Sequence, residues 1–192
     1  PDGKIRARGV AMAMQGSSIS NCDVGSVTVK LSDEGTYHIT VGCTDMGTGC
    51  DTIIAQFAAD VLETPIDNIS VYGVDTDISP YDSGSYASST TYITGGAVVK
   101  ACEKLIDKME LIAAGLMNCS KEEVQFEGNV VKRLGTDQSV SVEEIATKSQ
   151  LFNDESAEVT AMHTSPVSPP PFMVGMAEVE IDKETGAIEL ID

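Results

Sequence analysis

Alternating apolar and polar positions predict a β-hairpin early in the chain. Apolar residues occupy every second position over 27–31 and again over 37–41, and polar residues such as Thr28 and His38 lie between them. The intervening segment 32–35 has the composition of a turn. This pattern is typical of two antiparallel strands with one buried face and one hydrated face. His38 falls on the hydrated face, so we interpret it as a surface residue rather than a catalytic one.

A stripe of apolar residues at helical spacing follows the hairpin. Residues 53, 54, 57, 58, 61 and 62 are apolar, which predicts an amphipathic helix. We expect Asp51 or Thr52 to cap its start and Thr64-Pro65 to end it. Residues 69–74 are predicted to form the next strand. This order of strand, loop, helix and strand places the loop at the carboxyl end of a strand, where α/β layers usually bind ligands.

A longer helical stripe begins near Gly95 and ends near Met117. The segment 75–86 before it has no periodicity, and long loops of this kind are often functional. The remaining predicted elements are a strand over 10–14, a capped turn over 119–123, short strands over 124–126 and 130–132, and a helix over 141–147 that a Ser-x-x-Glu cap opens.

The C-terminal part of the chain begins with four prolines between residues 165 and 171, which predict an extended segment. A last hairpin is expected over 173–182 and 187–191. Its second strand reaches the end of the sequence without a further partner, and the chain starts at Pro1 without an initiator Met. We therefore expect this sequence to be an internal piece of a longer protein.

Acidic residues outnumber basic ones, with 30 Asp and Glu against 12 Lys and Arg, and the formal charge is −18. Nucleic acid and anionic membranes bind Lys and Arg, so this balance argues against both as main partners. Backbone donors can still hold an anionic ligand locally. No apolar run is long enough to span a bilayer, and no signal peptide opens the chain. Together with the missing signal peptide, the odd number of cysteines and the lack of a CxxC pair favour free thiols in a reducing cytoplasm. The cysteines are Cys22, Cys43, Cys50, Cys102 and Cys119.

Two loops rich in glycine and hydroxyl residues are the candidate ligand site. They cover 44–52 and 84–91, and a helical pattern follows each of them. The start of a helix offers unpaired N–H groups and the positive end of its dipole, so two such loops can form a cradle for a large anionic ligand. Two interpretations of the hydroxyl run 88–91 remain open. It either caps the following helix or binds phosphate or an oxo ligand through hydroxyl and N–H groups.

No catalytic constellation is visible in the sequence. Neither His38 nor His163 has a Ser or Cys nucleophile at a recognised spacing. There is no P-loop, and Gly47-Thr48-Gly49 lacks the third glycine of a dinucleotide-binding motif. Cys43 and Cys50 flank the first loop without a neighbouring His, so we assign no metal ligands. We interpret three loop carboxylates as solvated or turn residues: Asp33, Asp75 and Asp82.

A series of short motifs stands in order between residues 9 and 117, and a further match lies in the last hairpin. The motifs are Met46-Gly47-Thr48-Gly49-Cys50-Asp51-Thr52, Gln56, Ala59, Leu62, Asp75-Thr76, Gly84, Ala87-Ser88-Ser89-Thr90-Thr91, Gly95-Gly96-Ala97-Val98, Glu178-Val179-Glu180-Ile181-Asp182 and Thr185-Gly186. This series resembles the large molybdenum-binding subunit of the xanthine dehydrogenase and aldehyde oxidase family. Within that family it is most similar to the bacterial purine dehydrogenases, which act on xanthine or hypoxanthine.

The resemblance implies an α+β fold in which mixed or antiparallel β-sheet layers pack against two long helices. It implies that residues 1–164 form a region that binds the molybdenum cofactor, and that 165–192 form a crossing segment and the start of the next sheet region. It also implies an oxidoreductase that hydroxylates a purine-like N-heterocycle, or oxidises an aldehyde, with water as the oxygen donor. Electrons then pass to iron–sulfur centres and FAD on other domains or subunits.

The resemblance also assigns residues to the cofactor, which is molybdopterin, with the cytosine dinucleotide as one form it takes. The first loop lies against the pterin and the oxo ligand of the metal in family members, and the second donates to the pterin and phosphate. Thr48 stands where most members have Gln, and Ser89 where many have Arg. No residue matches the family's general-base glutamate, so we expect this piece alone to be inactive. The predicted cofactor-binding residues are Met46, Gly47, Thr48, Gly49, Ser85, Tyr86, Ala87, Ser88, Ser89, Thr90 and Thr91.

Two other classes of function remain open from the residues. One is a non-enzymatic assembly module whose glycine loops only start helices, and the other is a small-molecule sensor built on the same layers. For the family interpretation, the expected partners are the remainder of the large subunit, iron–sulfur and flavin subunits or domains, and a heterocyclic substrate. Neither nucleic acid nor a membrane is among them.

Overall fold

The computed structural model describes residues 3–152 and 156–192, and the chain divides into two compact units. The ribbon unit consists of Pro1–Ser17 and Pro169–Asp192, and the main unit consists of Ser18–Ser168. The regions 1–164 and 165–192 stay a prediction about cofactor binding, and their bounds differ from these units before Ser18 and over 165–168. Residues before Ser18 belong with the C-terminal residues because their strand pairs with a strand there.

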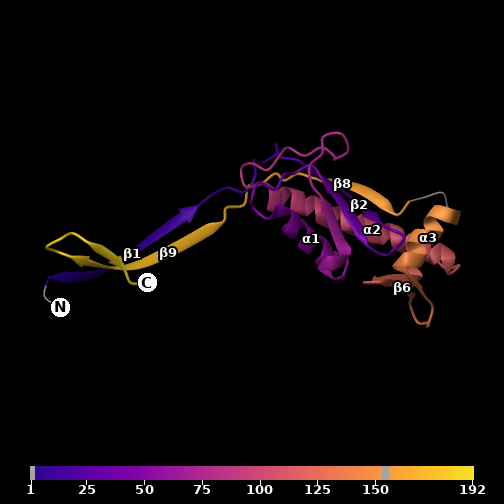
Figure 1. The fold of residues 1–192 in the computed structure, drawn as a ribbon. Helices are drawn as coiled ribbons and strands as arrows, with labels where there is room; N and C mark the ends of the chain where they lie inside the picture. The colour runs from indigo at the N-terminus through magenta and orange to yellow at the C-terminus, as the bar shows by residue number, and fades with distance from the viewer. Residues whose placement is uncertain (1–2, 153–155) are drawn as a thin grey trace. The chain divides into compact units, whose positions relative to one another are not determined.

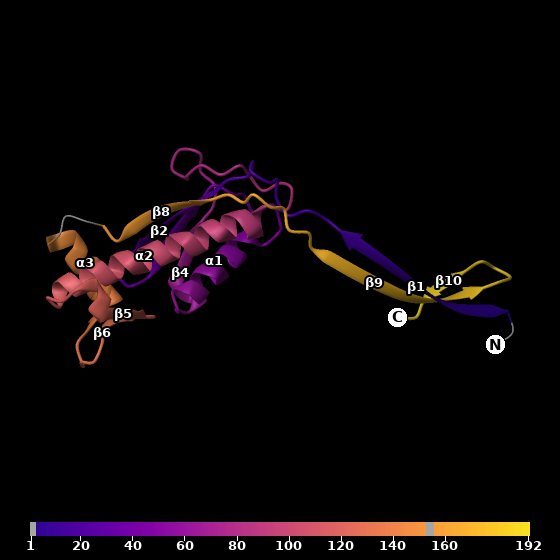
Figure 2. The ribbon, with the colours of Figure 1, turned by 180° about the vertical axis from the view of Figure 1, so that it is seen from behind.

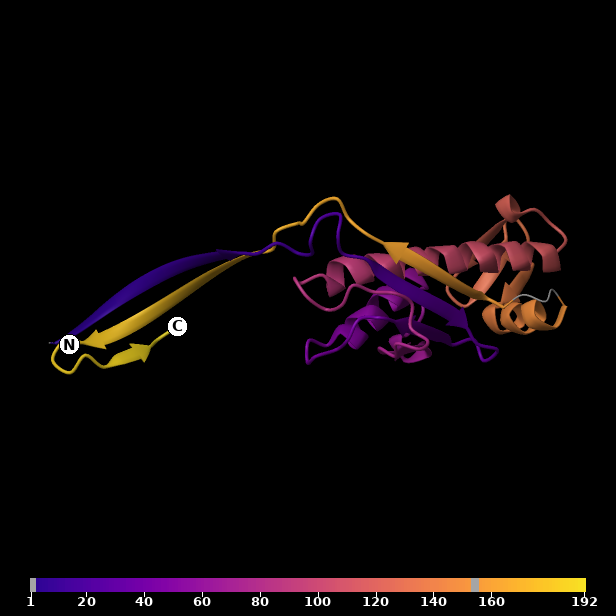
Figure 3. The same cartoon turned by 90° about the horizontal axis from the view of Figure 1, so that it is seen from above.

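A four-stranded mixed sheet forms the centre of the main unit, in the order β4-β3-β2-β8. β2 is antiparallel to both β3 and β8, whereas β3 is parallel to β4. The predicted hairpin is confirmed, with Val27 opposite Val41, while β8 was not predicted. Figure 3 shows β8 running antiparallel beside β2. The bounds are β2 (Gly25–Leu31), β3 (Tyr37–Val41), β4 (Ile69–Tyr72) and β8 (Glu158–His163).

Helices α1 (Cys50–Val61) and α2 (Gly95–Leu116) lie side by side and cover one face of this sheet (Figure 1), as the view from behind also shows (Figure 2). The predicted apolar stripes of both helices are confirmed, and they pack against the alternating apolar residues of β2 and β3. The other face carries polar groups, among them the exposed His38 and the hydrogen-bonded hydroxyls of Thr28 and Thr160. Completely buried core residues include Val27, Val29, Leu31, Ile39, Ala58, Val98, Ala101 and Leu105.

A second, smaller sheet in the order β5-β6-β7 lies beyond α2. The predicted capping box is present, since Ser120 and Glu123 each bond the other's backbone N–H at the start of a short 3₁₀ turn. Ser141 Oγ accepts the N–H of Glu144 at 3.2 Å, as the Ser-x-x-Glu pattern predicts. The bounds are β5 (Val124–Glu127), β6 (Val130–Arg133), β7 (Ser139–Ser141) and α3 (Val142–Phe152).

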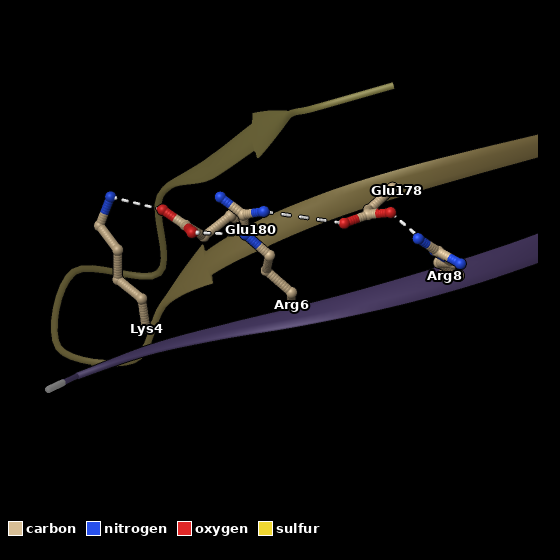
Figure 4. Close-up of polar contacts among 5 residues, drawn as sticks. All are labelled: Lys4, Arg6, Arg8, Glu178 and Glu180. Carbon is tan, nitrogen blue, oxygen red and sulfur yellow. Dashed lines mark hydrogen bonds and ion pairs between the residues drawn. The ribbon is translucent and has the colours of Figure 1, made fainter. Parts of the chain in front are cut away.

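The ribbon unit is a sheet in the order β1-β9-β10. It contains β1 (Lys4–Met14), β9 (Phe172–Asp182) and β10 (Ile188–Leu190), so the predicted last hairpin is confirmed and the first strand is longer than expected. On one face, Lys4 and Arg6 pair with Glu180 at 2.7 and 3.0 Å, and Arg8 pairs with Glu178 at 2.6 Å (Figure 4). The Arg side chains are exposed, and pairs of this kind contribute little to stability.

The same face of the ribbon continues as three apolar cross-strand pairs. Val10 lies opposite Met176, Met12 opposite Val174, and Met14 opposite Phe172, and all of these side chains are exposed. Charged pairs thus give way to an uncovered apolar surface along one pair of strands. Taken together, the sheets and helices confirm the predicted α+β class. Among the described residues, no helix is both long and apolar enough to cross a bilayer.

Candidate functional site

The two predicted loops meet in the structure. The N–H of Thr44 donates to Ser85 Oγ at 3.0 Å, and Ser85 Oγ donates to the Thr44 carbonyl at 2.8 Å. Thr44 lies just beyond the carboxyl end of β3, whose neighbour β4 runs parallel to it. The sequence motifs are therefore brought together at the expected edge of the sheet, over a separation of 41 residues.

The first loop is organised by a carboxylate that the sequence interpretation did not use. Asp45 Oδ1 accepts the N–H groups of Gly47, Thr48 and Gly49 at 2.8, 2.9 and 3.1 Å. These bonds, led by that of Gly47, hold the pKa of the Asp45 carboxyl below its usual value. The three N–H groups expected to face a ligand are thus engaged within the loop.

The start of α1 also differs from the prediction. Gly49 is the N-cap residue, with a φ of 74°, and as a glycine it has no side chain to cap the helix. The predicted caps Asp51 and Thr52 instead lie inside the first turn, because the helix already begins at Cys50. The side-chain bond at this helix start comes from upstream, where Asp45 accepts the N–H of Gly49. The Met46 side chain, 63% exposed, and the exposed Thr48 remain available to a ligand.

The second loop is fixed by hydrogen bonds from a distant segment. The Tyr86 hydroxyl donates to Asp23 Oδ1 at 2.7 Å, and the Ala87 carbonyl accepts the N–H of Ser18 at 2.8 Å. Asp23 is 1% exposed, and its other oxygen accepts the N–H of Ile19 at 2.8 Å. Ser89 is also buried and donates to the Gly84 carbonyl at 3.2 Å. Tyr86 and Ser89 therefore anchor the loop with their hydroxyls.

A π-helical turn over Thr90–Thr94 connects this loop to α2. Its N-cap residue, Ser89, makes no side-chain cap bond, so the interpretation of this run as a simple Ser/Thr cap is not supported. Thr94 Oγ1 donates to Asp82 Oδ2 at 2.9 Å, and Asp82 Oδ1 accepts the Gly84 N–H at 2.8 Å. Asp82 is thus a turn residue, one of the two roles expected for it, and it also bonds Thr94. Within the described part of the chain, the hydroxyls of Thr90 and Thr91 have no hydrogen-bond partner.

The cysteines near the site are buried thiols. Burial raises the pKa of Cys43 to about 12, and it also raises the pKa of Cys50, with the carboxylate of Asp51 contributing. Cys50, Asp45 and Asp51 place possible ligand atoms within 4.8 Å of one another. A protonated thiol and a carboxylate already engaged by N–H groups do not suit a metal ion. All five cysteines are free, as predicted.

Asp45→Ala is expected to loosen the first loop without unfolding the protein. It removes the acceptor of three N–H groups, so amide hydrogen exchange at Gly47, Thr48 and Gly49 should accelerate by about tenfold, as for one lost charged acceptor. Because the folded pKa of Asp45 is lowered, the bonds are intact above the ordinary aspartate pKa and are lost only as the pH falls through the lower folded value.

Exchange measured by mass spectrometry on the native protein at neutral pH checks this. Asp182→Ala is the matched control, since Asp182 Oδ1 accepts the N–H groups of Glu184 and Thr185 at 2.8 and 2.9 Å in the ribbon unit. It should change exchange only there. Unchanged exchange over 47–49 in Asp45→Ala would contradict the assigned role.

Both loops lie within a stretch of the chain that matches a known protein family. Residues 2–192 match the family described as molybdopterin cofactor-binding domain. The chain belongs to this family. Membership applies to the whole described sequence rather than to one motif, and it agrees with the resemblance of the ordered motifs around 46–52 and 84–98.

Relatives of this molybdopterin-binding chain are much longer proteins. The chain is 35% identical over 184 residues to the "Probable hypoxanthine oxidase XdhD" of Escherichia coli (strain K12). The aligned region covers 95% of this chain and 19% of the relative. It is 27% identical to the 6-hydroxypseudooxynicotine dehydrogenase complex subunit gamma of Paenarthrobacter nicotinovorans, covering 99% of this chain and 24% of the relative. The chain thus spans a quarter or less of the length of these relatives.

Solved structures share the fold of this molybdopterin-binding chain. Quinoline 2-oxidoreductase from Pseudomonas putida 86 superimposes with a TM-score of 0.84 at 23% identity, over 99% of this chain and 26% of that one. Carbon monoxide dehydrogenase from Oligotropha carboxidovorans gives a TM-score of 0.82 at 22% identity, over 97% and 25%. At these identities the likeness concerns the fold, and it supports the α+β class.

The loops of this family member fit a polar organic cofactor in two respects. A Cβ added at Gly47 or Gly49 would meet no atom within 4 Å, so the backbone there borders open space that a ligand can approach. Within the described residues, the hydroxyls of Thr48, Thr90 and Thr91 make no hydrogen bond to the protein. The donors are uncharged, since the segments 46–49 and 85–91 contain neither Lys nor Arg.

Sequence reasoning missed the carboxylates that hold these loops. Asp45 had a local signal, since an Asp two residues before a Gly commonly accepts N–H groups of its own turn. Asp23 had none, because its partner Tyr86 lies 63 residues away. The candidate residues thus divide into anchors, such as Tyr86 and Ser89, and residues open to a ligand, such as Met46 and Thr91.

Proposed function

We propose that the full-length protein containing this chain is a molybdenum hydroxylase that oxidises a purine-like N-heterocycle with water as the oxygen donor. In this proposal the segments 46–49 and 85–91 bind molybdopterin. The observation that supports it most is the pair of Thr44–Ser85 hydrogen bonds, which joins the two loops at one edge of the sheet in a member of the molybdopterin-binding family. Donors on two fixed loops can bind one extended ligand without rearranging.

The bound cofactor supplies the redox chemistry, and this chain binds and orients it. In our proposal the hydroxyls of Thr48, Thr90 and Thr91 donate to its polar groups, and Gly47 and Gly49 allow the backbone to approach it closely. Asp45 holds the glycine loop in its observed conformation through the three N–H bonds. Asp45 stays ionised because those N–H groups lower its pKa, and their positive ends partly offset its charge beside an anionic ligand.

The substrate class is supported by the names of the relatives. The relative at 35% identity is called a hypoxanthine oxidase, and another, at 32% identity over 134 residues, is the nicotine 6-hydroxylase large subunit of Paenarthrobacter nicotinovorans. Hypoxanthine and nicotine, the compounds in these two names, are both nitrogen heterocycles. A purine-like N-heterocycle is therefore our first choice, and the assembly and sensor alternatives have no comparable support.

The proposed partners are the remainder of the large subunit and subunits or domains that carry iron–sulfur centres and FAD. Relatives are named as a complex subunit and a large subunit, which supports this kind of assembly. The exposed apolar pairs of the ribbon unit, such as Met12 with Val174, also favour coverage by other protein, since a thin sheet uncovered on its apolar face is rarely stable in water. A cytoplasmic location remains our prediction.

Metal analysis and an activity assay on the full-length protein test the proposal together. We expect about one molybdenum per polypeptide, a value set by a single site, and dye reduction that depends on hypoxanthine or xanthine. Molybdenum with turnover of an aldehyde but of no purine would contradict the substrate class. Protein that is folded, contains no molybdenum and does not recover it on incubation with molybdopterin would contradict the function itself.

A further inference from the structure

The π-helical turn Thr90–Thr94 is the least regular element near the proposed site. Its closing bond runs from the N–H of Gly95 to the carbonyl of Thr90, which spans one residue more than an α-helical bond. Turns of this kind are rare and often occur at functional sites. Because each α-helical residue rotates by about 100°, the extra residue rotates everything before it by about that angle relative to α2. The turn therefore decides which way Thr90 and Thr91 point.

Contacts from two sides hold the turn in this form. The hydroxyls of Tyr92 and Ser165 lie 2.9 Å apart and form a hydrogen bond. Ser165 is itself fixed, because it is 4% exposed, its carbonyl accepts the N–H of Asn21 at 2.8 Å, and its Oγ accepts the N–H of Val167 at 3.2 Å. On the other side, Thr94 is bound to Asp82, as described above.

The backbone of the sheet also approaches the turn closely. A Cβ on Gly25, at the start of β2, would lie 2.7 Å from Thr94 Cα, so only glycine permits this packing. The ring of His163 meets that of Tyr92 edge to face, with centroids 6.3 Å apart and planes at 83°. Gly96 leaves the space for that ring, since a Cβ there would lie 2.5 Å from His163 Cδ2. Tyr92 is thus held by both its hydroxyl and its ring.

The side chains of the turn are of two kinds, those held by the protein and those left open to a ligand. Ile93 is buried, while Tyr92 and Thr94 are bonded to the protein. Within the described residues, only the hydroxyls of Thr90 and Thr91 are left without a partner in this turn, and Thr91 is exposed. An anchored turn with two spare neighbouring donors is the arrangement that a preorganised ligand site requires.

We infer that Tyr92 and Ser165 are positioning residues, whose hydrogen bond keeps the π turn in place and aims Thr90 and Thr91 at the cofactor. This inference rests on the proposed function and adds to it a device that sets how firmly the cofactor is held. If the bond is lost, the turn can relax towards an α-helical register, and the two hydroxyls rotate away. The cofactor then dissociates faster, although the fold remains.

The test uses Tyr92→Phe and Ser165→Ala in the full-length protein. Each removes one hydroxyl of the same bond. We expect molybdenum to be lost about five- to tenfold faster during dialysis, as for one net hydrogen bond, with little further loss in the double variant. The electron paramagnetic resonance signal of Mo(V) in partly reduced protein should also change, since the ligand surroundings move. Thr28→Val is the matched control. It breaks the hydroxyl–hydroxyl bond of 2.8 Å between Thr28 and Thr160, on the hydrated face of the central sheet.

A second set of variants distinguishes a positioning role of Tyr92 from a merely structural one. In protein that already carries Thr90→Val and Thr91→Val, Tyr92→Phe should have no further effect on the rate of molybdenum loss. An equal effect in both backgrounds overturns the inference, and so does retention in Tyr92→Phe and Ser165→Ala as good as in Thr28→Val. Wild-type protein without molybdenum overturns the proposed function as well, and this is measured before any variant is compared.

Discussion

Gly42→Ala is expected to displace the second loop and remove most of the molybdenum from the full-length protein. Gly42 follows the last residue of β3, and a Cβ there would lie 2.5 Å from the Pro80 carbonyl oxygen and 2.7 Å from Asp82 Cβ. Neither atom is the end of a flexible side chain, so the backbone over 80–82 has to move. Overpacking of this kind costs about 1–3 kcal/mol.

The loss of cofactor should exceed the loss of stability, because the displaced residue is an anchor. Asp82 binds both Gly84 and Thr94, so its movement disturbs the loop and the π turn together. Molybdenum per polypeptide and the thermal unfolding temperature are measured on the same samples. We expect a lower unfolding temperature with a larger relative fall in molybdenum.

Gly73→Ala is the matched control for this variant. Gly73 follows β4, the parallel neighbour of β3, and an added Cβ would lie 3.8 Å from the nearest atom, Asp51 Oδ2, which is an ordinary contact. It should leave molybdenum content and stability close to those of the wild type. If Gly42→Ala behaves like Gly73→Ala, the close approach of β3 and the 80–82 segment does not matter for the site.

Elements with a local signal could be predicted from the sequence. The hairpin of β2 and β3 joins neighbouring segments whose alternation leaves one choice of buried face, and its register follows. The stripe of α2 is long enough to average out single exceptions. The Ser120–Glu123 capping box needs only residues three apart, and it formed as predicted.

Elements that depend on distant partners could not be predicted in this way. β8 pairs with β2 from the far end of the main unit, and its inward residues Val159 and Ala161 are few and small. The pairing of β1 with β9 joins Lys4 to Asp182, and no periodic pattern links such remote segments. The failed prediction of Asp51 or Thr52 as a cap has a different cause, since the helix begins earlier, at Cys50, with Gly49 as its N-cap residue.

For the candidate site, the sequence indicated the place but not the use of each group. Both loops were expected to lie together at the carboxyl end of β3, and the Thr44–Ser85 bonds join them there. What could not be foreseen is which donors the protein itself consumes. That depends on Asp23 and Asp45, and for this reason our proposal gives the binding role to hydroxyls such as those of Thr48 and Thr91 rather than to the N–H groups of the first loop.

Gly49→Ala is expected to lower molybdenum content several-fold in the full-length protein, by placing a methyl group where the cofactor approaches. Gly49 has a φ of 74°, and an alanine in this left-handed conformation costs about 1 kcal/mol. That strain alone is too small to unfold a stable domain. The added Cβ meets no protein atom within 4 Å, so any larger effect has to come from contact with a ligand.

Gly135→Ala carries the same backbone strain at a place remote in sequence from both loops. Its φ is 73°, and a Cβ there also meets nothing within 4 Å. The two variants should therefore lose similar amounts of stability, measured as the thermal unfolding temperature, whereas only Gly49→Ala should lose molybdenum. Equal molybdenum content in both would show that the open space beside Gly49 is not where the cofactor lies. Because strain is matched, the difference between the two variants measures contact with the cofactor directly, and Gly47→Val, at a φ of 101°, should extend the loss further.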